Sequence, residues 1–255
     1  MPLADLVGIA IPVFFILLLA IERRYQARAF SPLPHWRLTG ALFFGLALLV
    51  GALVPLLLPV AWLAQHSLLD LHELGLWAIA PGVLAVTLLG YWLHRAMHRF
   101  DWLWLAAHQL HHSPDRVDLL GAYFSHPLEV ALKVTSSTLV STLLLGMSPL
   151  AAALVGLFVA LTSLFQHSNI NTPRWLGYIV QRPESHCLHH EYQVHGRNYS
   201  DLPLWDLVFG TFANPQRFTG KVGFQLATPP SVLDLLLMRD AHQAKPQPAN
   251  NGLTG

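Results

Sequence analysis

Long stretches without a formal charge constrain this chain more than any other feature. Residues 38–69 and 134–173 contain no Asp, Glu, Lys or Arg, and residues 6–21 form a third uncharged run. Only 11% of the 255 residues are charged, against about 25% in a typical soluble domain. Because a helix needs roughly 20 apolar residues to cross a bilayer, these runs predict an all-α bundle of membrane helices.

We expect about five transmembrane helices. The first covers residues 6–21, the second lies in the first part of 38–69, and the third covers 74–93. The last two cover residues 128–146 and 149–166, and a short turn that contains glycine and proline joins them as a hairpin. The chain then forms one domain with a helical cap at one end of the bundle.

Charge in the loops predicts the orientation of the bundle. Residues 22–37 carry four arginines and one glutamate, whereas residues 65–73 are acidic and carry no basic residue. The positive-inside rule therefore places the first loop in the cytoplasm and the N-terminus outside. The third span ends in the cytoplasm, and the hairpin returns the chain to that side. We expect a multi-pass integral membrane protein whose cap and C-terminus are cytoplasmic.

Histidines are concentrated in the predicted cap. Nine of the fifteen lie in residues 90–112 and 185–200. Eight of them form one HxxxH and two HxxHH groups: His94 and His98; His108, His111 and His112; His186, His189 and His190. Positions i, i+3 and i+4 share a helix face, so we expect each group to present two or three imidazoles to one spot. Neutral imidazole is a common ligand of first-row metals.

The number of histidines favours two metals. These eight are about twice what one tetrahedral zinc ion needs, so we expect two ions in a shared histidine cage. The single cysteine, Cys187, excludes a disulfide framework and a cysteine-type zinc site. The net charge of +1 gives no reason to expect nucleic acid as a partner.

Helix signals surround the histidine groups. We expect Asp101 to cap a helix over residues 102–112 and Pro183 to start a helix that runs through His190. Residues 231–238 are expected to form an amphipathic helix. Five carboxylates near the groups are candidates for orienting imidazole N–H groups: Asp101, Asp115, Asp118, Glu184 and Glu191.

The order HRAMH, HQLHH, HCLHH resembles the fatty acid hydroxylase superfamily, also called the sterol desaturase family. The segments HQLHHSPD, FSHPLE, FQHSN and NYSDLPLWDLVFGTF resemble further family signatures in the expected order. The resemblance covers residues 85–215. It implies a membrane-bound non-haem diiron oxygenase that uses O2 and two electrons to hydroxylate a C–H bond of a lipid. Fatty acyl, sphingolipid, ether-lipid and sterol-like substrates all fit it.

The resemblance assigns metal-ligand roles to the eight motif histidines and to His167 in FQHSN. Some members carry a second histidine shortly before that position, but residues 161–164 contain none. This leaves His126, His195 or a water to complete the ligand set. No residue beyond the ligands is assigned a catalytic role. Zinc can replace the two iron ions in purified protein.

We expect the chain to have three parts and to receive its electrons from a separate protein. Residues 1–84 hold the N-terminal transmembrane helices, 85–215 the histidine-motif catalytic region with its hairpin at about 128–166, and 216–255 an amphipathic segment with a disordered tail from residue 244. Because the sequence has neither a Gly-rich dinucleotide fingerprint nor a CxxCH haem site, we expect a separate reductase, ferredoxin or cytochrome as donor. The oligomeric state is left open.

Other functions are compatible with parts of the pattern. The same centre serves a lipid or sterol desaturase equally well. A metal transporter would carry ionisable ligands within its spans, and these spans contain almost none. A zinc-dependent membrane hydrolase would need a glutamate base, as in HExxH, and the sequence has no such motif.

Overall fold

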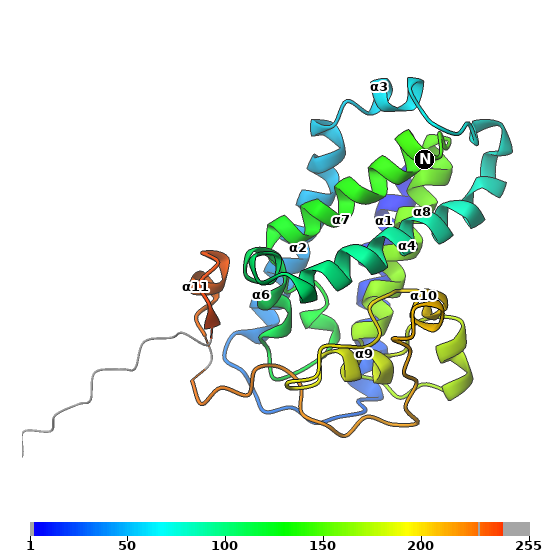
Figure 1. The fold of residues 1–255 in the computed structure, drawn as a ribbon. Coiled ribbons are helices and arrows are strands. Elements are labelled where there is room, and N and C mark those ends of the chain that lie inside the picture. Colours follow the sequence, from blue (N-terminus) through cyan, green and yellow to red (C-terminus); the bar gives the residue numbers. More distant parts are fainter. Residues whose placement is uncertain (1–2, 229, 242–255) are drawn as a thin grey trace, which may run out of the picture.

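Long helices packed side by side form the body of the protein, and short helices cover one end (Figure 1). The computed structural model describes residues 3–228 and 230–241. The disordered tail predicted from residue 244 therefore lies outside the described residues. Within the described part, the extended pairings are two isolated bridges, Gln26 with Ile170 and Glu191 with Val222. The expected all-α class is confirmed.

Five long helices build the bundle. They are α1 (Leu3–Arg24), α2 (Trp36–Leu57), α4 (Ile79–Arg99), α7 (Pro127–Leu139) and α8 (Pro149–His167). Two short elements, α3 (Val60–Gln65) and η1 (His72–Ala78), connect α2 to α4 at the end of the bundle that lies away from the cap (Figure 1). Helix α1 packs against α8, α2 packs against α7, and α4 packs against both α7 and α8.

Four helical segments of the described residues are long and apolar enough to cross a membrane: Leu6–Arg24, Trp36–Leu57, His72–Arg99 and Pro149–His167. Their exposed side chains are largely apolar; Ile16 is 64% exposed and Leu57 is 82% exposed. Such a surface suits contact with lipid rather than water. The chain is an integral membrane protein. The span predicted over residues 128–146 corresponds to α7 and the π-helical turn η4 (Val140–Leu144), and it stays a prediction.

The hairpin turn before α8 forms where the glycine and proline signals place it. Ser148 caps α8 by accepting a hydrogen bond from the backbone N–H of Ala151, and Pro149 occupies the first turn. Gly146 has a φ of +57°, and a Cβ at this position would collide with the carbonyl oxygen of Leu69. Only glycine fits this close approach without strain.

Short elements around the bundle end carry the histidines. The second group lies on one helix in three parts, α5 (Asp101–Leu103), η2 (Trp104–His108) and α6 (Gln109–His112), of which η2 is a π-helical turn. Asp101 makes no capping hydrogen bond, because the helix already begins at Asp101 after Phe100. The predicted Asp101 cap is therefore wrong, whereas the predicted end of this helix before Ser113 is confirmed.

The remaining cap elements follow α8. They are η5 (Arg174–Tyr178), α9 (Pro183–His189), α10 (Pro203–Val208) and α11 (Val232–Leu236), with η3 (Leu119–Gly121) lying earlier in the chain. Pro183 starts α9 as predicted. The amphipathic segment near the C-terminus forms α11, which Ser231 caps. Helix α11 packs Leu235 into an apolar cluster with Trp36, Leu110 and Phe224.

Candidate metal centre

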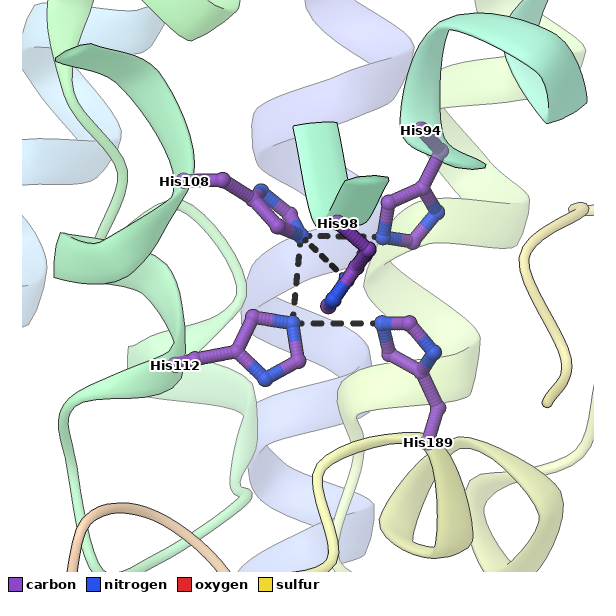
Figure 2. Close-up of side chains that lie close together, drawn as sticks. All are labelled: His94, His98, His108, His112 and His189. Atoms are coloured by element: carbon purple, nitrogen blue, oxygen red, sulfur yellow. Dashed lines mark hydrogen bonds between the residues drawn. The ribbon is translucent and has the colours of Figure 1, made fainter. Parts of the chain in front are cut away.

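Among the described residues, nine histidines converge in two groups at the cap end of the bundle. Within each group, one ring nitrogen from each histidine lies within 4.8 Å of those of the other members. We name them the five-histidine site, with His94, His98, His108, His112 and His189, and the four-histidine site, with His111, His167, His186 and His190. Figure 2 shows the five rings of the first site, which point toward one another. Two come from α4, two from the helix formed by α5, η2 and α6, and one from α9. All nine belong to the residues that the sequence singles out.

The five-histidine site centres on His108. Its Nε2 lies 2.9 Å from Nε2 of His94 and 3.1 Å from Nε2 of both His98 and His112 (Figure 2). Nε2 of His189 lies 3.2 Å from Nε2 of His112. Five inward nitrogens at such spacing are more than N–H···N hydrogen bonds can satisfy, because each neutral ring has one N–H. A cation placed among them would satisfy all five.

The four-histidine site has the same character. Nε2 of His167 lies 3.1 Å from Nε2 of His111 and 2.9 Å from Nε2 of His186. Nε2 of His190 lies 3.1 Å from Nε2 of His186. The two sites are neighbours, since the rings of His112 and His190 stack with centroids 4.1 Å apart. The residues present therefore suit two adjacent metal ions with all-nitrogen ligand sets.

Each HxxHH group divides its histidines between the two sites. His108 and His112 belong to the five-histidine site, whereas His111 belongs to the other. His186 and His190 belong to the four-histidine site, whereas His189 belongs to the first. Successive residues on a helix point about 100° apart, so positions i and i+4 stay together while position i+3 turns toward the neighbouring site. Each group thus presents two imidazoles to one spot, within the expected two or three, and the third imidazole of each HxxHH group belongs to the neighbouring site.

Backbone carbonyls orient several of the rings from outside. Nδ1 of His94 donates to the carbonyl of Tyr199 at 2.7 Å, and Nδ1 of His189 donates to the carbonyl of Arg197 at 2.8 Å. Nδ1 of His167 lies 2.6 Å from the carbonyl of its own helix at position 163. A proton on Nδ1 leaves the lone pair of Nε2 directed into the site, which is the tautomer that metal binding needs.

Burial keeps the cap imidazoles neutral. It is the main cause that holds the pKa well below 6.5 for His111, His112, His186, His189 and His190. Neighbouring histidines add to the effect, since a charged neighbour disfavours a second charge. These rings are thus available as metal ligands at neutral pH.

Two further predicted candidates lie outside both sites. His126 caps α7, with Nδ1 accepting from the N–H of Leu128 and Nε2 lying 3.2 Å from the carbonyl of Leu236. His195 lies beside the five-histidine site and stacks on His98 with centroids 5.6 Å apart. Its ring nitrogens are not among the converging five.

Cap residues of the NYSDLPLWD segment hold the first site in place. The carboxylate of Asp206 is fully buried and accepts from the N–H of Tyr199 at 2.8 Å, the N–H of Ser200 at 3.0 Å and the hydroxyl of Thr211 at 2.7 Å. Because the carbonyl of Tyr199 receives His94, this carboxylate supports a ring of the five-histidine site from behind.

Three of the five carboxylates predicted to orient imidazoles have other partners, and Asp115 accepts from the backbone N–H of Gln225. Asp118 accepts from the indole N–H of Trp36, and Glu184 pairs with the fully buried Arg182. The carboxylate that lies against a clustered histidine is Glu129, with Oε1 3.2 Å from Nδ1 of His108. Sequence reasoning missed this role, although a glutamate in the FSHPLE segment at the start of an apolar hairpin is a visible signal.

Comparisons with known proteins identify a family whose matched region contains all nine histidines. The sequence model of the fatty acid hydroxylase family matches residues 79–211, which hold all nine histidines. An ornithine lipid hydroxylase from Rhizobium tropici is 31% identical over 247 residues, which cover 87% of this chain and 72% of that protein.

Two plant relatives match a shorter region. A very-long-chain aldehyde decarbonylase from Oryza sativa subsp. indica is 30% identical over 129 residues, and sphinganine C4-monooxygenase 1 from Arabidopsis thaliana is 29% identical over 126 residues. Each match covers 48% of this chain and 48% of the relative, so the chain spans about half the length of these curated relatives. No solved structure matches the chain. Because the family model covers more than half of the chain and the relative from Rhizobium tropici matches most of it, the chain belongs to the fatty acid hydroxylase family.

Proposed function

We propose that this protein is a membrane-bound diiron oxygenase that hydroxylates a C–H bond of a lipid. The observation that carries the proposal is the pair of adjacent all-histidine sites at one end of apolar helices. Lipid chains lie in the bilayer, so an enzyme that oxidises them needs its centre at the membrane surface. Several relatives, including an alkylglycerol monooxygenase from Xenopus tropicalis, are hydroxylases or monooxygenases of sphinganine, ornithine lipid and alkylglycerol, and they support the same class of substrate.

The nine histidines would hold the two ions. Iron bound there would supply the redox chemistry that couples O2 reduction to oxidation of an unactivated C–H bond. The overall reaction consumes the lipid, O2, two electrons and two protons, and yields the alcohol and water. The protein residues hold neutral imidazoles at fixed positions and exclude bulk water, because the histidines of both sites are largely buried.

We further propose that the metal centre faces the cytoplasm and that the N-terminus lies outside. Four arginines in residues 22–37 support this orientation through the positive-inside rule. A cytoplasmic centre can receive electrons from a soluble or membrane-bound reductase, ferredoxin or cytochrome. Cysteine substitution in the loops over 22–37 and 65–73, followed by labelling of intact cells with an impermeant maleimide, tests the orientation.

The experiment that tests the proposed function follows oxygen into lipid. Cells that express the protein and cells that express the His186→Ala variant are grown under ¹⁸O2, and their lipid extracts are compared by mass spectrometry. We expect a lipid that gains one ¹⁸O atom only with the wild-type protein. A lipid that loses two hydrogens without gaining ¹⁸O would assign the protein to desaturation.

Metal analysis of the purified protein tests the centre itself. We expect two irons per chain, which Mössbauer spectroscopy of ⁵⁷Fe-loaded protein identifies. One zinc per chain and turnover without O2 would instead indicate a hydrolase. Metal flux into sealed vesicles would indicate a transporter.

A further inference from the structure

A buried charge of helix α7 lies directly against the proposed metal centre. Glu129 stands in the first turn of α7 and is fully buried. Its Oε1 lies 3.2 Å from Nδ1 of His108, whose ring is also fully buried. Nε2 of the same ring is the atom on which the five-histidine site converges (Figure 2). The carboxylate therefore contacts the central ring of that site from behind.

The contact of His108 differs from those of the other rings. The outer nitrogens of His94, His167 and His189 face backbone carbonyls, and that of His111 lies 3.2 Å from the hydroxyl of Ser125. These partners are neutral. Among the ion pairs of the described residues, the one with Glu129 is the pair that joins a carboxylate to a clustered histidine.

The negative charge of Glu129 would offset part of the positive charge of the two proposed cations. Two cations held by neutral imidazoles would bring their full charge into a buried site, and a buried carboxylate is itself unstable without a cation nearby. Lys133, one helical turn further along α7, has its Nζ 2.6 Å from the same oxygen of Glu129. Its side chain is 48% exposed, whereas that of Glu129 is 1% exposed. The glutamate therefore presents its negative charge to the metal side and has a solvated counterion behind it.

On the basis of the proposed diiron function, we propose that Glu129 is a positioning residue of the five-histidine site. The contact is an ion-pair approach rather than an aligned hydrogen bond. The negative charge beside Nδ1 favours the tautomer that carries its proton there, which directs the lone pair of Nε2 to the metal and makes this imidazole a stronger donor. Among the described residues, no carboxylate is in ion-pair contact with a ring of the four-histidine site, although the charge of Glu129 also acts on His111 from a greater distance. The two ions are therefore unequal, and the ion in the five-histidine site depends on Glu129.

Metal competition in Glu129→Gln tests the inference, because glutamine keeps the shape and removes the charge. Purified wild-type and variant protein are loaded with ⁵⁷Fe and titrated with a chelator. Elemental analysis then counts the metals, and Mössbauer spectroscopy separates the two iron signals. We expect one of the two irons to bind about 10- to 100-fold more weakly in the variant, with its signal changed and the other signal intact. Ser125→Ala, which removes the neutral partner of His111, should instead affect the other iron.

A purely structural ion pair makes different predictions. In that case Glu129→Gln and Lys133→Met would act alike, and both would lower the melting temperature of the metal-free protein. A positioning role predicts that Lys133→Met keeps both metals and that Glu129→Gln does not lower the metal-free melting temperature, because a buried charge has been removed. Equal chelator competition and unchanged spectra in Glu129→Gln would overturn the inference. If the wild-type protein binds two irons but oxidises no lipid, the proposed function fails while these metal measurements still decide the role of Glu129.

Discussion

Replacement of Asp206 by alanine should destabilise the cap and loosen the five-histidine site. The carboxylate accepts three hydrogen bonds, two of them from the backbone N–H groups of Tyr199 and Ser200. Both residues are buried, being 9% and 2% exposed, so water cannot replace the lost acceptor. A buried donor without a partner costs about 1–3 kcal/mol, and two such donors give a loss of about 2–6 kcal/mol.

Thermal unfolding in detergent measures this loss. For a chain of this size each kcal/mol lowers the melting temperature by about 2–4 °C, so we expect a decrease on the order of 5–20 °C. Asp206→Asn keeps one carbonyl oxygen and should fall between wild type and Asp206→Ala. Asp234→Ala serves as the matched control, because Asp234 is exposed and contacts Ser231 and Arg239 at the end of the chain. That control should melt close to wild type.

The effect should extend to the metal. The carbonyl of Tyr199 orients His94, so the fraction of Asp206→Ala that stays folded should lose metal from the five-histidine site more readily than the control. A melting temperature within about 2 °C of wild type, well below the range worked out above, together with normal metal content would refute the view that this carboxylate holds the loop.

Three further predictions follow from burial and backbone geometry. Burial lowers the pKa of the cap imidazoles, so protons should compete with the metal only below the usual imidazole pKa of 6.5. The midpoint of metal release on acid dialysis should therefore lie below pH 6.5, and release at or above pH 6.5 would contradict this prediction. Burial raises the pKa of the Cys187 thiol to about 11, so a maleimide at pH 8 should label it only after denaturation, and rapid labelling of the folded protein would show that the thiol is exposed. Gly146→Ala should lower stability by about 1–3 kcal/mol, because alanine is strained at a φ of +57° and its Cβ meets a carbonyl. Gly156→Ala in α8, where a Cβ meets nothing within 4 Å, should match or exceed wild type in the same melting assay.

Four of the predicted spans and the turn before α8 could be predicted from the sequence, because they depend on local physics. An uncharged run long enough for the bilayer becomes a helix wherever it occurs, and Gly146 and Pro149 break the last run at the right point. The histidine residues could also be predicted, since their spacing is a local property of a helix. For the same reason Pro183 correctly marks the start of α9.

The division of histidines between two sites could not be predicted in this way. Whether His111 faces the same ion as His108 depends on where the other helices stand, and the π-helical turn before His108 changes the direction of the rings. Tertiary placement also decides the partner of each carboxylate. Glu184 lies two residues before His186 in sequence yet pairs with Arg182, whereas Glu129 is far from every histidine group in sequence yet contacts His108.

The division of each HxxHH group has a consequence for biosynthesis. His98 and His108 appear early during translation, but the five-histidine site also needs His189, and the four-histidine site needs His186 and His190. A nascent chain that stops before α9 therefore holds no complete site for either ion. Loading of the two proposed ions would have to wait until the chain has been made through His190 and α9 has folded back onto the earlier helices. Each of the two proposed ions would link a segment made before α7 to the segment of α9, which is made much later.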